Sequence, residues 1–579
     1  MNNTVKYAIL GCLASLSFTA RANIGIDPAT NQAIEKILSE FNSPGKPALA
    51  VTVIKEGKPI YEKAFGSANL EYKTPATVDT KFQVDAFAWE FIAYAALKLE
   101  AQGKIKLDDD IRKYLPELPD LGEKVTVDHL LSSTDGYYGY KALKSLSGWE
   151  TKDPEQHKSI LRIIKSQKAL NFKPGKAFSP GGDTRLILLA SIVESVTGQS
   201  FDAYCNSQIF APLGMSNTVF LYDSNQAPDN TAVPYRSESN GTYKRDYGDS
   251  TAPGPVNLYT SIRDLSVWRS HISARTPGIS SLVNKMNSPI KLDGGAMIKD
   301  VASISNYGQQ HVGKERGIPK VYLRGISGGY SSTLFRFPEQ DFSVIVLSSG
   351  LAYNGSYGMQ IANLFMNNHF PEPETIDYTK IEGVKLSRQQ LQQFVGNYWN
   401  PVRALNARVH LKDDVLYYSR VDGSDGNALI PLGNSTFQIT IEGDDKILLK
   451  FIDKAGGKDM NYTVNDSDPV VFESYKPTSY ANNEMTQFTG TFYSNELNSS
   501  FVFDVNNGVL TASNVRSGTI KFKPLSPNMF SGDKSFLRGI RFIRGNNNEV
   551  TGFKVAVDTV RSLVFKKVQE DDNRKLFSL

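Results

Sequence analysis

Residues 81–107 read KFQVDAFAWEFIAYAALKLEAQGKIKL, and the rest of the chain is organised around this stretch. Apolar residues run almost without a break over 86–99, Asp85 or Thr80 can cap the start, and Gly103 supplies the stop. An apolar run without a polar face is typical of a helix that is buried on nearly every side. The sequence therefore predicts a central helix here.

The segments before this helix have clear periodicities. Residues 23–42 place apolar side chains at helical spacing and predict an amphipathic helix. Residues 48–71, ALAVTVIKEGKPIYEKAFGSANLE, predict two strands joined at Glu56 and Gly57, a dipeptide that favours a hairpin turn.

Several ordered blocks together resemble a known family. The blocks are KIKLDDDIRKYLPELPDLGEKVTVDHLLSSTDG at 104–136, NFKPGKAFSPGGDTRLILLASIVESVTGQSFDAYCNSQIFAPLGMSNT at 171–218, GPVNLYTSIRDLSVW at 254–268 and YLRGISGGYSSTLFRFPEQDFSVIVLSSG at 322–350. They resemble serine β-lactamases and penicillin-binding proteins, the group that includes class C β-lactamases, D,D-peptidases, D-aminopeptidases and some esterases. The resemblance implies an α/β (α+β) fold with a central antiparallel sheet flanked by helices.

The resemblance also implies a site at the start of the central helix. Members of this group open the helix with S-x-x-K, which places a nucleophilic serine and a lysine one turn apart on the same face. Counting back from Gly103, the serine position is Ala86 and the lysine position is Trp89. An alanine has no nucleophilic oxygen, and an indole N–H donates a hydrogen bond but cannot accept a proton. The sequence predicts that the acyl-enzyme route through Ala86 is closed.

The other two motifs of the group also differ from the expected pattern. The tyrosine and asparagine of Y-x-N fall on Pro180 and Gly182 or on Gly181 and Asp183, depending on whether the count starts from Phe178 or Glu194. Asp183 is expected to cap the following helix. The K-T-G or H-x-G motif falls on a strand at Leu323, Arg324 and Gly325. Arg324 could still bind a carboxylate, or it could be an exposed strand arginine.

A relocated nucleophile is the alternative to an inactive protein. Serines near the expected site are candidate nucleophiles, and nearby tyrosines and a lysine are candidate bases: Ser132, Ser133, Ser327 and Ser331, with Tyr137, Tyr138 and Lys141. Serines next to turns more often cap or hydrogen-bond the backbone. We therefore expect structural roles for these serines.

Two similar segments follow the family-like part. They are LQQFVGNYWNPVRALNARVHLKDDVLYYSR and MTQFTGTFYSNELNSSFVFDVNNGVLTASN, each with a short lead, alternating apolar residues and a turn. They predict a repeat of two barrel-like antiparallel β-domains, similar to the C-terminal domains of D-aminopeptidases. The predicted divisions are a signal peptide at 1–22, a β-lactamase-like domain at 23–370, a linker at 371–387, and β-domains at 388–476 and 484–579.

The N-terminal segment predicts export. An apolar run over 7–20 is followed by Ala20-Arg21-Ala22, so we expect a secretory signal peptide cleaved after Ala22 and a secreted or periplasmic protein. A lipoprotein signal at Cys12 is the less favoured alternative, and the run is shorter than the roughly 20 residues that span a membrane. The remaining cysteine, Cys205, is expected to be buried in a helix.

Composition limits the partners. A net charge of +4 over 579 residues is close to neutral, whereas a nucleic-acid binder normally has a concentrated basic patch, so nucleic acid is not expected as a partner. The six histidines are scattered, and neither a metal nor another cofactor is expected. The sequence favours a pseudoenzyme that binds a peptidoglycan-derived or other acyl or peptide ligand, or a protein partner. The alternatives are an active serine hydrolase with a relocated nucleophile and a scaffold that acts through its β-domains.

Overall fold

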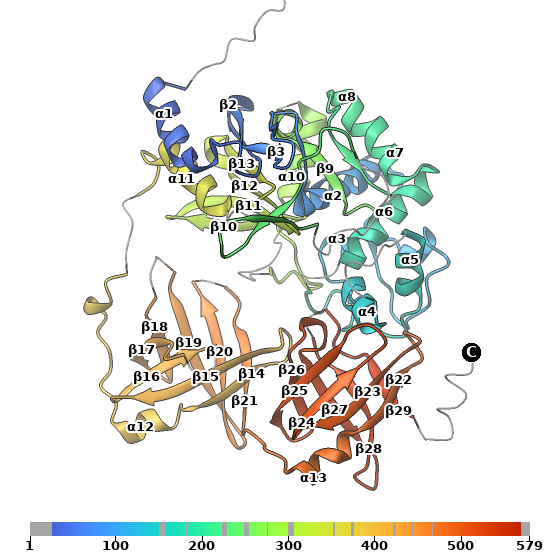
Figure 1. The fold of residues 1–579 in the computed structure, drawn as a ribbon, viewed down its shortest axis with the longest axis vertical. Coiled ribbons are helices and arrows are strands. Elements are labelled where there is room, and N and C mark those ends of the chain that lie inside the picture. The colour runs from blue at the N-terminus through green and yellow to red at the C-terminus, as the bar shows by residue number, and fades with distance from the viewer. Residues whose placement is uncertain are drawn as a thin grey trace, which may run out of the picture.

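The computed structural model describes most of the chain. The described ranges are 26–149, 157–179, 183–222, 228–247, 254–274, 276–298, 306–350, 354–371, 376–420, 424–441, 445–465, 467–557 and 559–568. The expected signal peptide, with Cys12 and the cleavage site, and Pro180, Gly181 and Gly182 lie outside them. A large α/β domain occupies one end of the molecule and two β-barrels the other (Figure 1).

The large domain is built on a six-stranded antiparallel sheet. Its strand order is β10-β11-β12-β13-β1-β2. The strands are β1 (Leu49–Lys55), β2 (Lys58–Phe65), β10 (His311–Glu315), β11 (Ile318–Ser327), β12 (Tyr330–Phe337) and β13 (Phe342–Ser348). The predicted hairpin at Glu56 and Gly57 is confirmed, since both residues have positive φ and Lys55 pairs with Lys58.

Alternation along the strands gives the sheet two apolar faces. One face, with Ala50 and Leu334 among its residues, packs on α2 (Asp85–Ala101) and α9 (Ile262–Ser273), and α6 (Asp183–Thr197) packs on α2 in the same core. The other packs on α1 (Pro28–Ile37) and α11 (Asn354–Met366). The remaining helices are α3 (Val127–Leu131), α4 (Tyr140–Leu146), α5 (His157–Lys165), α7 (Phe201–Cys205), α8 (Ala211–Leu213) and α10 (Pro277–Asn287). Cys205 is buried, as predicted.

Helix α2 is the predicted central helix. It is buried along most of its length, and it ends before Gly103, whose φ is +69°. The expected cap at its start is wrong: Val84 is the N-cap, no side chain caps the helix, and Asp85 is its first residue. Because α2 is buried nearly throughout, packing rather than a side-chain cap fixes the residue at which the helix begins.

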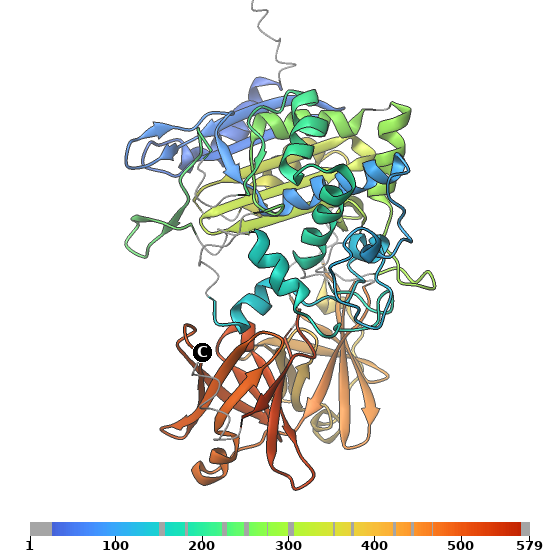
Figure 2. The same cartoon turned by 90° about the vertical axis from the view of Figure 1, so that its right-hand side faces the viewer.

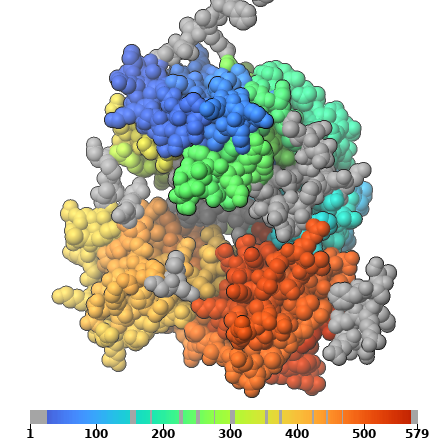
Figure 3. All heavy atoms as spheres, viewed as in Figure 1, coloured from blue at the N-terminus to red at the C-terminus, as the bar shows by residue number. Residues whose placement is uncertain are grey.

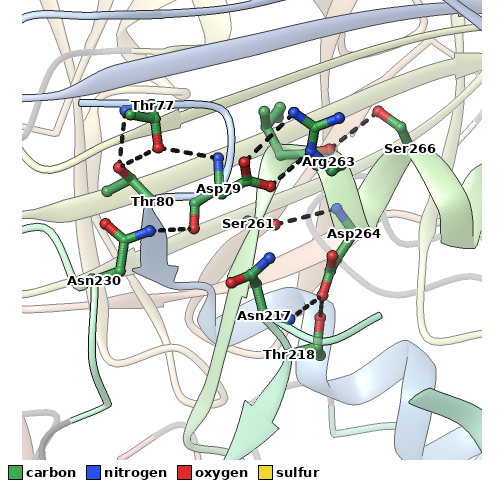
Figure 4. A network of polar contacts seen from close by, with 11 residues as sticks. Thr77, Asp79, Thr80, Asn217, Thr218, Asn230, Ser261, Arg263, Asp264 and Ser266 are labelled. Atoms are coloured by element: carbon green, nitrogen blue, oxygen red, sulfur yellow. Dashed lines mark hydrogen bonds and ion pairs between the residues drawn. The ribbon is translucent and has the colours of Figure 1, made fainter. Parts of the chain in front are cut away.

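A small sheet delivers the chain into α2. Strand β5 (Lys81–Gln83) pairs with β9 (Leu258–Ser261), which pairs with β6 (Val219–Phe220). A polar network ties this sheet to α9 (Figure 4): Asp264 accepts hydrogen bonds from Thr218 Oγ1 at 2.7 Å and from the Asn217 N–H at 2.8 Å. In the same network Arg263 Nε donates to Asp79 at 2.6 Å, just before β5. The start of α2 is therefore held from outside the helix.

The remaining short strands lie in two small pairs. They are β3 (Ser67–Asn69) with β4 (Thr74–Pro75), and β7 (Tyr235–Ser237) with β8 (Tyr243–Arg245).

The two predicted β-domains are closed eight-stranded barrels. In each, every strand pairs with the next and the last with the first. Barrel 1 consists of β14 (Gly396–Asn400), β15 (Leu405–Lys412), β16 (Val415–Ser419), β17 (Asn427–Gly433), β18 (Thr436–Ile439), β19 (Ile447–Lys454), β20 (Gly457–Val464) and β21 (Val470–Tyr475). Barrel 2 consists of β22 (Gly490–Ser494), β23 (Ser499–Asn506), β24 (Val509–Ser513), β25 (Thr519–Ser526), β26 (Met529–Gly532), β27 (Gly539–Arg544), β28 (Val550–Val555) and β29 (Val564–Lys567). Short helices lead into them, α12 (Arg388–Gln392) and α13 (Asn482–Met485).

The barrels lie side by side against the large domain (Figure 3). Trp399 of barrel 1 is buried with Leu525 and Met529 of barrel 2. A Cβ on Gly539 would lie 3.1 Å from the Trp399 ring, so the two barrels are in close contact there.

Candidate functional site

Ala86 and Trp89 lie one turn apart at the start of α2. Ala86 is 2% exposed, and its N–H lies in the first turn, where a helix offers no acceptor. Trp89 is partly buried against the core of the domain, and its Nε1 is buried without a hydrogen-bond partner among the described residues. At the two positions matched to serine and lysine, the structure therefore has a methyl group and an indole.

Strand β11 brings Gly325 against Ala86. A Cβ on Gly325 would lie 2.9 Å from the Ala86 nitrogen and 2.8 Å from Ser332 Oγ, so the close approach requires glycine. Leu323 points to the same face and is fully buried. Side chains alternate along a strand, which puts the exposed Arg324 on the opposite face, away from Ala86.

The edge of β11 next to Ala86 has no strand partner among the described residues. β10 pairs with Ile318–Tyr322 only, and from Leu323 onward β11 pairs with β12 alone. Gly328 and Gly329 form a two-residue turn, so Ser327 and Tyr330 flank the hairpin as a hydrogen-bonded pair. The alternation then directs the N–H of Ile326 toward the open edge.

Two further helices begin at the same place and bring three charged side chains together. Lys141, in the first turn of α4, pairs with Asp183, the first residue of α6, at 2.7 Å between Nζ and Oδ2. Burial raises the pKa of Asp85 to about 6, with Lys141 opposing and Asp183 adding to the rise. Against the lowering effect of desolvation, Asp183 and Asp85 raise the pKa of Lys141 well above its ordinary value. We call Asp85, Ala86, Lys141, Asp183 and Gly325 the Ala86 site.

The Ala86 site joins residues from all three predicted motif regions. Gly325 lies against Ala86, and Asp183 acts on the neighbouring Asp85; Asp183 is the first residue of α6 rather than its cap. The sequence indicates Lys141 only as a possible base and does not predict its ion pair with Asp183. No local pattern indicates this pairing, because the two residues are far apart in sequence.

The candidate replacement nucleophiles are buried. Ser132, Ser133, Ser327 and Ser331 are all between 0 and 7% exposed. Ser132 Oγ donates to the Asp128 carbonyl at 2.7 Å, and Ser327 Oγ donates to Gln83 at 2.9 Å, which are the structural roles expected of such serines.

The candidate bases have pKa values shifted away from that role. Burial raises the pKa of Tyr138 to about 12, although Ser562 opposes the rise, and it raises the pKa of Tyr137 further. Lys141 stays protonated in its ion pair. None of these three side chains is a good proton acceptor at neutral pH.

A buried polar network supports the back of α2. Glu90 and Arg269 form an ion pair in which both side chains are 1% exposed, and Gln310 Nε2 donates to Glu90 at 3.1 Å. Sequence reasoning missed this network, because Glu90 is a single charge inside an apolar run. The network fixes the helix face behind Trp89.

The sequence matches a known protein family. The family model described as Beta-lactamase matches residues 32–364, more than half of the chain. The chain belongs to the beta-lactamase family. Its family part is the large domain, and the β-barrels lie outside the match.

Individual relatives of this family member are distant. The chain is 24% identical over 358 residues to a D-aminopeptidase of Gluconobacter oxydans, covering 62% of this chain and 66% of the relative. It is 27% identical over 261 residues to a D-aminopeptidase of Brucella anthropi, covering 44% and 48%. The alignments thus span about half to two thirds of these relatives. The octameric penicillin-binding protein homologue from Pyrococcus abyssi shares the fold, with a TM-score of 0.51 and 22% identity over 77% of this chain and 99% of that one.

The described ranges contain neither a membrane-spanning helix nor a cluster of metal-ligating side chains. Every helix there is too short or too polar to cross a lipid bilayer. In the same ranges, no three His, Cys, Asp or Glu side chains gather in a way that could hold a metal ion.

Proposed function

We propose that this family member binds a peptide at the Ala86 site without forming an acyl-enzyme. The observation that carries the proposal is the pair of residues at the start of α2: Ala86 beside Gly325, and Trp89 one turn later. In subtilisin, loss of the serine nucleophile alone lowers turnover about a million-fold. The buried serines nearby and the protonated Lys141 offer no replacement.

The backbone at the site supports peptide binding. The N–H of Ala86 lies in the first turn of α2, and that of Ile326 faces the open edge of β11. Backbone donors of this kind suit a peptide carbonyl, and an open strand edge suits an extended peptide that adds to the sheet. Neither feature depends on the side chains at positions 86 and 89.

The relatives suggest the ligand class. Two of them are D-aminopeptidases, and a solved relative is a penicillin-binding protein homologue. We therefore propose a peptide that contains D-amino acids, such as a cell-wall peptide, as the ligand. Such a ligand lies outside the cytoplasm, in keeping with the signal peptide that the N-terminal sequence predicts.

Intact-mass spectrometry tests the absence of acylation. The protein is incubated with a panel of β-lactams and a fluorophosphonate, and we expect no mass increase. A stoichiometric increase that disappears when the protein is heat-denatured before labelling would overturn the proposal and indicate a relocated nucleophile.

Fluorescence anisotropy tests binding. The probes are a labelled peptide ending in D-Ala-D-Ala and its all-L counterpart. We expect saturable binding of the D-peptide and about three- to tenfold weaker binding by Ile326→Pro, which removes one backbone donor. Ile326→Val keeps the N–H and is the matched control. Equal binding of both peptides would contradict the proposed class of D-amino-acid ligands, and binding unaffected by the proline would contradict a strand-edge site.

A further inference from the structure

Helix α4 is shared between the large domain and barrel 2. Tyr138, Leu143 and Leu146 are fully buried, and they belong to the apolar core of barrel 2, with Phe492 and Phe501 among its residues. Figures 1 and 2 show α4 lying over the end of this barrel. A seven-residue helix is too short to be stable alone. Its conformation therefore depends on this packing.

Hydrogen bonds also join the segment around α4 to barrel 2, and we call this contact the junction. The Gly139 N–H donates to the Thr559 carbonyl at 3.0 Å, and the Tyr138 and Ser562 hydroxyls are 3.0 Å apart. Asn171 Nδ2 also donates to the Thr559 carbonyl at 3.0 Å. A Cβ on Gly139 would lie 2.7 Å from Thr559 Oγ1 and 2.8 Å from its Cβ, so the surfaces meet without spare room.

The other side of α4 contacts the Ala86 site. Lys141 Nζ is 2.7 Å from Asp183. Thr184, the next residue of α6, accepts the Tyr140 N–H at 2.9 Å and donates to the Tyr138 carbonyl at 2.6 Å. One short segment thus joins barrel 2 to the start of α6.

We infer that Lys141 is a positioning residue of the Ala86 site, and that the docking of barrel 2 holds it there. Without this docking, α4 loses the core in which its Leu143 and Leu146 and the preceding Tyr138 are buried, and Lys141 is released from Asp183. Site geometry and barrel docking are then coupled, and the coupling is reciprocal: whatever binds at the site also strengthens the docking. This inference concerns the docking alone and does not depend on which ligand the site takes.

Competitive acetylation of the full-length protein tests the inference. Acetic anhydride reacts with the free amine, and peptide mass spectrometry over a pH series compares Lys141 with the exposed Lys104. The Lys141 side chain is 47% exposed, so the reagent reaches it, and its raised pKa should make it several-fold less reactive than Lys104. Hydrogen exchange of peptides covering 140–146 and 559–565 reports docking in the same samples.

Variants on both sides of the junction perturb docking. Thr559→Leu adds side-chain volume against Gly139 from the barrel side, and Gly139→Ala adds a methyl group against Thr559 from the α4 side. Gly139→Ala with Thr559→Gly relieves the overlap, and Gly313→Ala, at an open position, is the control.

We expect the two single variants to exchange faster at the junction and Lys141 to approach the reactivity of Lys104, with recovery in the paired variant. Lys141 protection that persists after docking is lost overturns the inference, and so does docking that survives both variants. If one of the two single variants fails to fold, the other still tests whether Lys141 protection depends on docking.

Discussion

Replacing Gly325 by alanine should strain the contact between β11 and α2. The new Cβ would lie 2.9 Å from the Ala86 nitrogen and 2.8 Å from Ser332 Oγ, where ordinary contacts begin at 3.4 Å. Forcing extra atoms into a packed core costs about 1–3 kcal/mol. Gly→Ala also stabilises by about 0.4–1 kcal/mol through the unfolded chain, and Gly313→Ala, which meets nothing within 4 Å, measures that effect separately.

Urea unfolding measures the difference in stability between Gly325→Ala and Gly313→Ala. Unfolding is monitored by pulsed hydrogen exchange of the peptide that covers α2. With a slope of about 3 kcal/mol/M, the midpoint for Gly325→Ala should lie about 0.3–1 M below that for Gly313→Ala. Adding Ser332→Ala should recover only part of the loss, because the Ala86 nitrogen belongs to the backbone and cannot be removed. Equal midpoints for the two glycine variants would refute the close approach of β11 to Ala86.

Three further perturbations test other parts of the molecule. Arg269→Met should cost about 3–5 kcal/mol in urea unfolding, because it leaves Glu90 buried without its partner, and adding Glu90→Leu should recover most of the loss. Burial raises the pKa of Asp135 to about 6, so ionisation of this carboxyl lowers the stability of the folded state as the pH rises from 4 through 6. Thermal melts at pH 7 and pH 4.5 should therefore show the wild type gaining stability at the lower pH relative to Asp135→Asn. Trp399→Ala should cost about 3–5 kcal/mol and speed hydrogen exchange in both barrels while α2 is unchanged, since Trp399 packs between them.

The features predicted from sequence have strong periodicity. The nearly unbroken apolar run of α2, the hairpin at Glu56 and Gly57 and the alternating strands of the barrels all appear in the structure. Each is set by burial, and a burial pattern is visible in a single segment. The N-terminal helix is shorter than predicted: α1 ends at Ile37, and a 3₁₀ turn over Ser39–Phe41 continues the apolar face.

The missed features depend on contacts between distant segments. Lys141 lies in the mixed stretch YYGYKALKSL at 137–146, and neither its pairing with Asp183 nor the burial of Leu143 in barrel 2 can be recognised from its neighbours. Helix α4 has apolar side chains for a core that is built more than 300 residues later in the chain. Sequence periodicity shows that a face is buried, but it does not show against which partner.

The geometry of the Ala86 site is explained by packing rather than by chemistry. Gly325 is required because the backbone at Ala86 approaches it, whatever side chain position 86 has. Glu90 and Arg269 need each other because both are buried, whether or not a reaction takes place nearby. A serine-to-alanine difference at position 86 removes one oxygen and disturbs neither requirement. The backbone donors of Ala86 and Ile326 can therefore stay in place without a nucleophile, and this is why binding is the function we expect the site to keep.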